Sequence, residues 1–110
     1  MAIFKYGIPK ISLMATGTEI RLSKIMRKGK MLCIPMDHGI SNGPIEGLEK
    51  PHDVIYKCEN HGLTSIIINK GIIKTLPRPT KVGILAHFSS STVLSLSPNR
   101  KMLTGSVKEA

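Results

Sequence analysis

Three short, mainly apolar runs divide the chain, and each run is followed by polar residues. They cover residues 31–36, 64–69 and 81–87, and the middle run contains three consecutive isoleucines. Continuous apolar runs of this length are typical of strands that are buried on both faces, as in parallel sheets. The pattern therefore predicts three parallel strands.

The segments beside these runs carry helical patterns. Residues 18–28 predict a helix with Thr18 as its cap and Gly29 just beyond its end, and residues 51–61 predict a second helix. A short third helix is predicted over 72–76. Strand, helix and strand within about forty residues form one βαβ unit, whose crossover should be right-handed. The expected fold class is therefore α/β.

The two ends of the chain are less regular. Residues 1–17 show no clear period and are predicted to form an irregular N-terminal arm, ahead of one domain over residues 18–110. Residues 102–104 predict the start of a fourth strand, and residues 105–110 predict the start of a helix. A sheet of three or four strands that does not close on itself leaves two open edges.

The first apolar run stops at Asp37 and His38, after which Gly39, Gly43 and Pro44 predict a loop. A carboxylate and an imidazole therefore lie where a buried strand opens to solvent. In α/β barrels and open parallel sheets, ligands bind at this carboxyl end of the strands. Asp37 is the first candidate for chemistry. The alternative is a turn, in which the Asp37 carboxylate accepts bonds from backbone N–H groups and His38 is a packed or capped imidazole.

Two further candidates follow the other strands. Lys70 comes directly after the second strand, where a desolvated amine could form a Schiff base, although an exposed loop lysine gives the same pattern. His87 ends the third strand and could line the same mouth as Asp37, or bond the backbone of a neighbouring loop. The serine-rich residues 89–92 fit either a phosphate cradle or a Ser/Thr turn.

The charge narrows the function classes. Sixteen Lys and Arg against seven Asp and Glu give a net charge of +9, which would suit a polyanion. The basic residues are scattered, however, and an aromatic content of 4% is too low for a base-stacking platform. Nucleic acid is therefore not the expected partner. The excess lysine fits a solvated surface, with some bias towards phosphorylated substrates.

The cysteines and the hydropathy indicate a location. Cys33 and Cys58 show no Cys-x-x-Cys spacing and are interpreted as reduced core thiols. No apolar run approaches the ~20 residues of a membrane span, and the N-terminus lacks the apolar core of a signal peptide. His52 and His61 are not spaced as a metal-binding pair. We therefore expect a cytoplasmic protein with no membrane partner and no metal.

One long motif connects the chain to a family. Residues 35–48, Pro-Met-Asp-His-Gly-Ile-Ser-Asn-Gly-Pro-Ile-Glu-Gly-Leu, resemble the strand-1 signature of the archaeal class I (DhnA-type) aldolase family. Residues 87–92, His-Phe-Ser-Ser-Ser-Thr, resemble that family's His-hydrophobic-Ser-x-Ser-Thr element. The run Ile-Arg-Leu at 20–22 is similar to the family's segment before strand 1. The resemblance extends from there to residue 110.

The resemblance implies a (β/α)8 TIM barrel, which normally needs about 250 residues. A chain of 110 residues cannot close such a barrel. The expected architecture is therefore a partial barrel, with an N-terminal helix and roughly the first three to four βα units. An N-terminal helix of this kind is expected to cover the bottom of the barrel.

The resemblance also implies a cofactor-free lyase or transferase that forms a lysine Schiff base with a phosphorylated keto-sugar. The motif is most similar to that of family members that transfer the bound fragment to aspartate semialdehyde in aromatic amino-acid biosynthesis. The resemblance gives Asp37 the role of catalytic proton acceptor. The expected substrate-binding residues are Asp37, His38, Gly39, Ile40 and Ser41.

Two catalytic groups of the family have no counterpart in this chain. The Schiff-base lysine lies on a later strand, and Tyr6 and Tyr56 do not match the position of the tyrosine proton donor. The first hypothesis is therefore the N-terminal portion of an aldolase, inactive alone, from a family whose full-length members are expected to form homo-oligomers. The alternatives are a fragment of a class I fructose-bisphosphate aldolase, or a non-enzymatic basic binding module.

Overall fold

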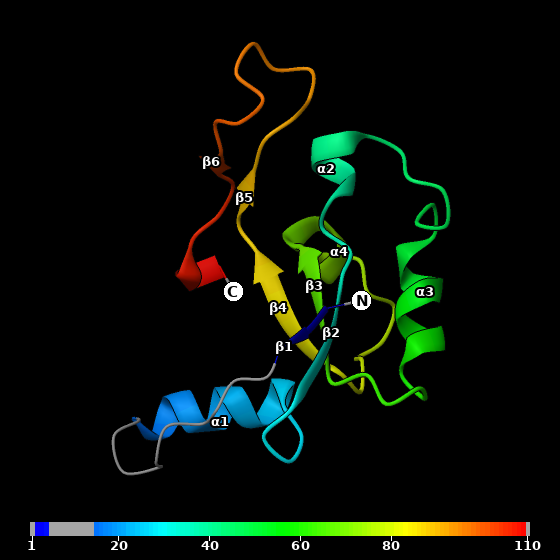
Figure 1. Cartoon of the computed structure of the whole chain (residues 1–110), viewed down its shortest axis with the longest axis vertical. Helices are drawn as coiled ribbons and strands as arrows, with labels where there is room; N and C mark the ends of the chain where they lie inside the picture. Colours follow the sequence, from blue (N-terminus) through cyan, green and yellow to red (C-terminus); the bar gives the residue numbers. More distant parts are fainter. Residues whose placement is uncertain (1, 5–14, 110) are drawn as a thin grey trace.

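A small, mostly parallel sheet forms the centre of the protein. The computed structural model describes residues 2–4 and 15–109. The sheet has the order β1-β2-β3-β4, in which β1 is antiparallel to β2 and the other pairs are parallel (Figure 1). Its strands are β1 (Ala2–Phe4), β2 (Met31–Pro35), β3 (Ser65–Asn69) and β4 (Gly83–His87). The three parallel strands predicted from the apolar runs are confirmed.

Helices connect and flank these strands. Helix α1 (Thr16–Ile25) precedes β2, and α3 (Pro51–Cys58) forms the crossover from β2 to β3. Helix α4 (Lys70–Lys74) follows β3 directly, two residues earlier than the sequence predicts. Helix α3 begins at Pro51, which needs no intrahelical partner for its missing N–H. Within the described residues, no helix is long and apolar enough to cross a membrane.

The core lies between the sheet and helices α3 and α4. Ile66 and Ile68 on β3 are completely buried, and so is Ile55 on α3. Successive strand residues alternate between faces, so Ser65, Ile67 and Asn69 lie on the opposite face of β3. Strand β3 is buried at every residue except Ile67, whereas β4 is only half-buried along its length. The predicted burial on both faces therefore holds for the central strand and not for β2 or β4, in which Cys33 alone is buried.

Thr64 ties the starts of the three parallel strands together. Its backbone N–H donates to Leu32 O at 3.0 Å, and its carbonyl accepts the N–H of Gly83 at 2.9 Å. Its hydroxyl accepts the Leu32 N–H at 3.0 Å and donates to Leu32 O at 3.1 Å. A buried hydroxyl with both donor and acceptor partners costs little to bury, so these bonds can fix the strand register.

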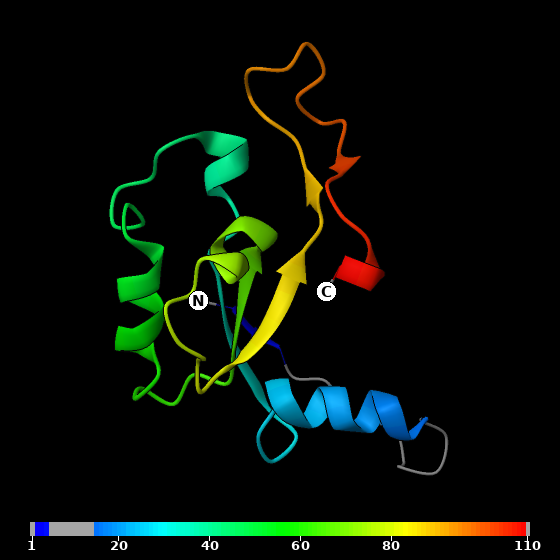
Figure 2. The same ribbon diagram turned by 180° about the vertical axis from the view of Figure 1, so that it is seen from behind.

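Helix α1 lies at the end of the sheet where β4 begins (Figure 1, Figure 2). A Cβ atom at Gly83 would lie 2.3 Å from Lys24 O and 2.7 Å from Ile25 Cγ2, so only glycine permits this packing. A tight turn then leads into β2, with reciprocal backbone bonds between Arg27 and Lys30. Lys28 and Gly29 both have positive φ in this turn.

The predicted N-terminal boundary differs from the structure. The predicted irregular arm over residues 1–17 contains strand β1 and the first residues of α1, while residues 1 and 5–14 lie outside the described residues. Helix α1 begins at Thr16 after Ala15, and Thr18 does not cap it. Strand β1 covers the β2 edge that was expected to be open. Its three residues are too few to show a strand period in the sequence.

Three other predictions are wrong in detail. The loop predicted after Asp37 contains a short helix, α2 (Gly39–Asn42), because His38 takes a helical conformation and its carbonyl accepts the Asn42 N–H. The predicted fourth strand, β6 (Met102–Leu103), pairs antiparallel with β5 (Ser89–Ser90) and does not join the main sheet. The predicted C-terminal helix is a single 3₁₀ turn, η2 (Val107–Glu109), with Ala110 outside the described residues.

Glu59 fixes the segment that leads into β4. Its side chain is only 2% exposed and accepts bonds from Arg78 Nη2 at 3.0 Å and from the Lys81 N–H at 2.8 Å. Arg78 also lies over the ring of Tyr56, 3.8 Å from its centroid. The hydrogen bonds from Arg78 and then Lys81 lower the pKa of Glu59 from 4.5 to about 2.

We predict that Glu59 makes stability depend on pH between 4.5 and about 2. Because its pKa is lowered by folding, its contribution is full above pH 4.5 and is lost as the pH falls through about 2. Urea unfolding at several pH values across this interval should show that the free energy of unfolding falls less steeply with decreasing pH in Glu59→Gln than in the unmodified chain. Asp53→Asn, at an exposed position on α3, is the matched control. An unchanged slope in Glu59→Gln would contradict the prediction.

Candidate functional site

The candidate site lies at the carboxyl ends of the parallel strands, at the opposite end of the sheet from α1 (Figure 1). Asp37 follows β2 by two residues, and His87 is the last residue of β4. Between them lies Asn69, the last residue of β3, which pairs in register with His87. Pro35 pairs with Ile67, so Asp37 continues β2 to the level of Asn69. Three polar residues therefore end three neighbouring strands.

The structure brings Asp37 and His87 into direct contact. Nδ1 of His87 contacts Oδ2 of Asp37, which makes the two an ion pair when the imidazole is protonated. The Nδ1 atom is inaccessible to solvent. The side chain of His87 is 24% exposed, and that of Asp37 is 20% exposed. Nε2 of His87 lies 2.8 Å from the hydroxyl of Ser89. Both ring nitrogens thus face side chains, and the alternative in which His87 bonds loop backbone is not observed.

The other predicted site residues lie in and around α2. His38 precedes the helix and is half-buried, Gly39 and Ile40 are exposed, and Ser41 is half-buried. The Ser41 carbonyl accepts the N–H of Val93 at 3.0 Å, which fastens α2 to the segment that follows β5. The predicted binding segment is therefore a short helix held over the end of the sheet.

A cavity of about 690 Å³ separates α2 from α4. Gly39 and Ile40 line it together with Asn69 and Lys70, and most of the remaining wall is apolar. Asp37 is not part of this wall, although the neighbouring Met36 is. The structure thus places the predicted residues on two sides, with Asp37 beside His87 and with Gly39 and Ile40 facing the cavity.

The surroundings of Lys70 do not favour a role as a nucleophile. Its Nζ lies 3.4 Å from Oε1 of Glu109, and the two side chains are 38% and 44% exposed, respectively. The N–H of Ser106 and then the Lys70 amine lower the pKa of Glu109, which keeps that carboxylate charged. A Schiff-base lysine needs a desolvated neutral amine. The exposed ion pair provides the opposite environment.

The serine-rich segment has two structural roles. Ser89 contacts His87, whereas the Thr92 carbonyl accepts the N–H of Ser95 in a turn. The turn alternative is therefore observed for the end of this segment. Within residues 2–4 and 15–109, no three His, Cys, Asp or Glu side chains gather in a group that could hold a metal ion.

Sequence analysis did not single out Asn69, and it included Ser89 only as part of the serine-rich residues 89–92. Asn69 is 9% exposed and lies between Asp37 and His87 on the same face of the sheet. A signal for it exists in the sequence, because the last residues of adjacent parallel strands with matched alternation share one face. Ser89 had no comparable signal, since its contact depends on the direction of the chain after His87.

A comparison against known families identifies the family of the chain. The sequence model of the DeoC/LacD family of aldolases matches residues 31–110, which include the three parallel strands and every residue of the candidate site. The chain belongs to the DeoC/LacD aldolase family. The resemblance to class I aldolases inferred from residues 35–48 and 87–92 is thereby confirmed.

Three relatives show which aldolases the chain resembles. The chain is 33% identical over 96 residues to 2-amino-3,7-dideoxy-D-threo-hept-6-ulosonate synthase 1 of Archaeoglobus fulgidus, covering 86% of this chain and 36% of the relative. It is also 33% identical over 95 residues to the synthase of that name from Halobacterium salinarum, with the same coverage of 86% and 36%. An uncharacterized aldolase of Saccharolobus solfataricus is 34% identical over 58 residues, 53% of this chain and 21% of that protein. The chain thus spans little more than a third of the length of the two synthases.

The contact between Asp37 and His87 predicts a tautomer of the imidazole. Because Nδ1 faces a carboxylate and Nε2 faces a hydroxyl, the neutral ring should carry its proton on Nδ1. Nitrogen-15 NMR of the neutral ring should show a protonated Nδ1. The Asp37→Ala variant should shift the population towards the Nε2–H form, whereas Asp53→Ala should leave it unchanged. A predominant Nε2–H form in the unmodified chain would exclude the proposed hydrogen position.

Proposed function

We propose that this chain is the N-terminal part of a Schiff-base aldolase or transaldolase of the 2-amino-3,7-dideoxy-D-threo-hept-6-ulosonate synthase type. In this proposal a fragment of a phosphorylated keto-sugar is transferred to aspartate semialdehyde, and Asp37 is the proton acceptor. The observation that carries the proposal is the Asp37 carboxylate held by His87 at the carboxyl ends of β2 and β4. The two similar synthases support the choice of substrate class.

The environment of Asp37 suits proton transfer. Its side chain is 20% exposed, so it is partly dehydrated yet still open to a ligand. Oδ2 of the carboxylate contacts Nδ1 of His87, while neither carboxylate oxygen accepts a well-aligned hydrogen bond from any described residue. A positioned carboxylate of this kind can take a proton while a carbon–carbon bond is cleaved or formed. His87 acts here as a positioning residue.

The amine and the proton donor must come from outside this segment. Lys70 is paired with Glu109, as described above. The Tyr56 hydroxyl donates to Arg78 O at 2.7 Å, on α3 and away from the strand ends. Tyr6 lies outside the described residues. The chain alone therefore contributes one of three catalytic groups, and we infer that it is inactive by itself.

A cytoplasmic location fits this function. Cys33 and Cys58 are free thiols, and Cys33 is 1% exposed in the sheet. Free buried cysteines are typical of reducing compartments, where metabolic aldolase substrates are also found.

We predict that the isolated chain forms no trappable Schiff base. Incubation with a phosphorylated keto-sugar and borohydride should give no stoichiometric adduct by mass spectrometry, because the lysine at the strand end is solvated and ion-paired. A class I aldolase treated in parallel verifies that trapping works. A reduced adduct on Lys70 would contradict both the inference that the chain is inactive by itself and the inference that the Schiff-base lysine lies outside it.

The role of Asp37 can be tested in a chimera. In the Archaeoglobus fulgidus synthase, the portion similar to this chain is replaced by the chain itself. If Asp37 accepts the proton, Asp37→Asn should lower the turnover of the chimera by about 10²–10⁴-fold. The exposed Asp53→Asn on α3 is the matched control and should retain turnover. Near-normal turnover in a folded Asp37→Asn chimera would show that Asp37 is only a structural partner of His87 and not the proton acceptor.

A further inference from the structure

His87 joins two other side chains at the carboxyl ends of the strands. Its Nε2 atom lies 2.8 Å from Oγ of Ser89, and its Nδ1 atom contacts Oδ2 of Asp37. A hydroxyl, an imidazole and a carboxylate in contact in this order form the arrangement that activates serine nucleophiles. Such arrangements are recognised by the contacts between the three side chains and not by their order in the sequence. The function proposed above gives Ser89 no role.

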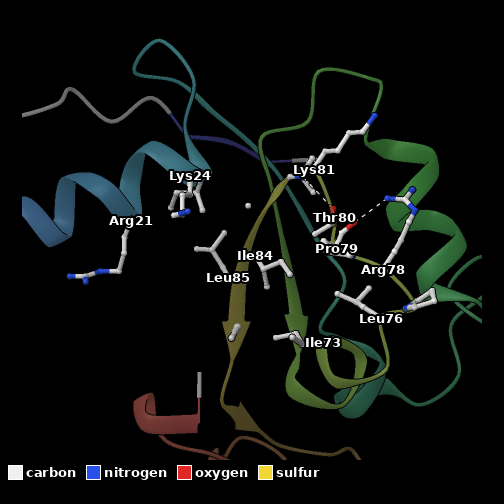
Figure 3. A pocket seen from close by; sticks show the side chains of 15 residues that line it. Arg21, Lys24, Ile73, Leu76, Arg78, Pro79, Thr80, Lys81, Ile84 and Leu85 are labelled. Atoms are coloured by element: carbon white, nitrogen blue, oxygen red, sulfur yellow. Dashed lines mark hydrogen bonds between the residues drawn. The ribbon is translucent and has the colours of Figure 1, made fainter.

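Strand alternation places the three side chains on one face of the sheet. Leu85 and Ile84 point to opposite sides of β4, and Ile84 packs against the core (Figure 3). Because successive residues of a strand alternate between faces, His87 and Ser89 share the side of Leu85, away from the core. Asp37 reaches the same face from the end of β2. The contact between His87 and Ser89 therefore follows from their spacing of two residues, and the contact with Asp37 follows from the register of the sheet.

The contacts assign the hydrogen positions that a nucleophilic serine needs. With Nδ1 facing a carboxylate, the neutral imidazole of His87 carries its proton there, which leaves the lone pair of Nε2 for the Ser89 hydroxyl. Because Nδ1 is inaccessible to solvent, water does not compete with Asp37 for it. Ser89 is half-buried, so part of the residue stays open to a reagent.

The backbone of Ser89 supplies a hydrogen-bond donor beside this hydroxyl. The Gly83 N–H donates to Thr64 O on the β3 side of β4. Phe88 O accepts the N–H of Thr104 on the opposite side, where β6 lies. Peptide groups alternate between these two sides, so the N–H of Ser89 is directed to the β3 side, where no strand of the described residues pairs with β5. An N–H of the nucleophilic residue itself is one of the donors that stabilise the oxyanion in acyl transfer.

We propose that Ser89 is a nucleophile for acyl transfer from esters, with His87 as its general base and Asp37 as the group that orients the imidazole. Oγ attacks the carbonyl carbon of the ester while its proton passes to Nε2, and the N–H of Ser89 faces the oxyanion that forms. The bond to the leaving alcohol then breaks, and the imidazolium returns the proton to that alcohol. Water, deprotonated by Nε2, attacks the acyl-serine, which releases the acid and restores Ser89. Because one backbone donor faces the oxyanion, the expected substrates are small esters with a good leaving group and not amides.

This activity does not depend on the proposed aldolase function. It needs neither a Schiff-base lysine nor a tyrosine proton donor, and all three side chains that it uses belong to the described residues. The two proposals are also tested in different proteins. Acyl transfer by Ser89 is measured in the isolated chain, whereas proton transfer by Asp37 is measured in the chimera.

The first test treats the whole chain with diisopropyl fluorophosphate and locates the label by mass spectrometry. Attack by Oγ forms a bond to phosphorus and displaces fluoride, so we expect one label per chain, on Ser89. Ser89→Ala should lose this label. Ser90→Ala, at the next position of β5, is the matched control and should keep it. Labelling of other residues at an equal rate, or unchanged labelling of Ser89→Ala, would overturn the proposal.

Hydrolysis of p-nitrophenyl acetate separates activation by His87 from simple exposure of a hydroxyl. His87→Gln should lower the Ser89-dependent release of p-nitrophenol by about 10²–10⁴-fold, because the general base is lost. Asp37→Asn should also lower it, because the imidazole can then carry its proton on Nε2 and no longer accepts the hydroxyl proton. Asp53→Asn, exposed on α3, is the matched control and should release p-nitrophenol at the unmodified rate.

Circular dichroism and urea unfolding verify that each variant is folded. A folded His87→Gln chain that releases p-nitrophenol as fast as the unmodified chain would overturn the role of the imidazole and with it the proposal. If His87→Gln or Asp37→Asn does not fold, the comparison of Ser89→Ala with Ser90→Ala still decides, because it removes one hydroxyl in each case and no core contact. Equal release by these two serine variants would count against Ser89 as the nucleophile.

Discussion

The register of β3 between its two parallel neighbours is the constraint on which the rest of the structure depends. Thr64 fixes it at one end of the sheet, where its backbone and hydroxyl bond Leu32 and Gly83 together. At the other end, the same register brings Asn69 level with Asp37 and His87. A slip by one residue would turn Ile66 and Ile68 away from the core and move the polar residues to the opposite face. The same strand register therefore determines both the packing of the core and the geometry of the site.

Sequence reasoning reached the parts of this structure that depend on local pattern. The apolar runs gave the three parallel strands, and the position of Asp37 at a strand end followed from the abrupt change in polarity. Strand β1 was missed because three residues are too few to show the alternation of a strand. Helix α2 was missed because Gly39 and Gly43 favour a loop in the sequence, although the residues between them form a single helical turn. The contact between Asp37 and His87 could not be predicted, since it depends on the distance across β3 rather than on any spacing in the chain.

Contacts between side chains and with the backbone hold the residues around Asp37 in place. The chain holds a carboxylate in place through an imidazole, and it fastens α2 above the strand ends through the Ser41 carbonyl. Lys70, at the end of β3, is ion-paired with Glu109 at 3.4 Å.

Every residue that builds the Asp37 end of the site lies within one continuous stretch, from the start of β2 to the serines after β4. Adjacent strands of this stretch are also neighbours in the sheet, so their pairing closes only short loops of chain. During synthesis, such a segment can take up its register before later residues emerge from the ribosome. The geometry of the carboxylate would then be settled early, before the residues after β5 are synthesised.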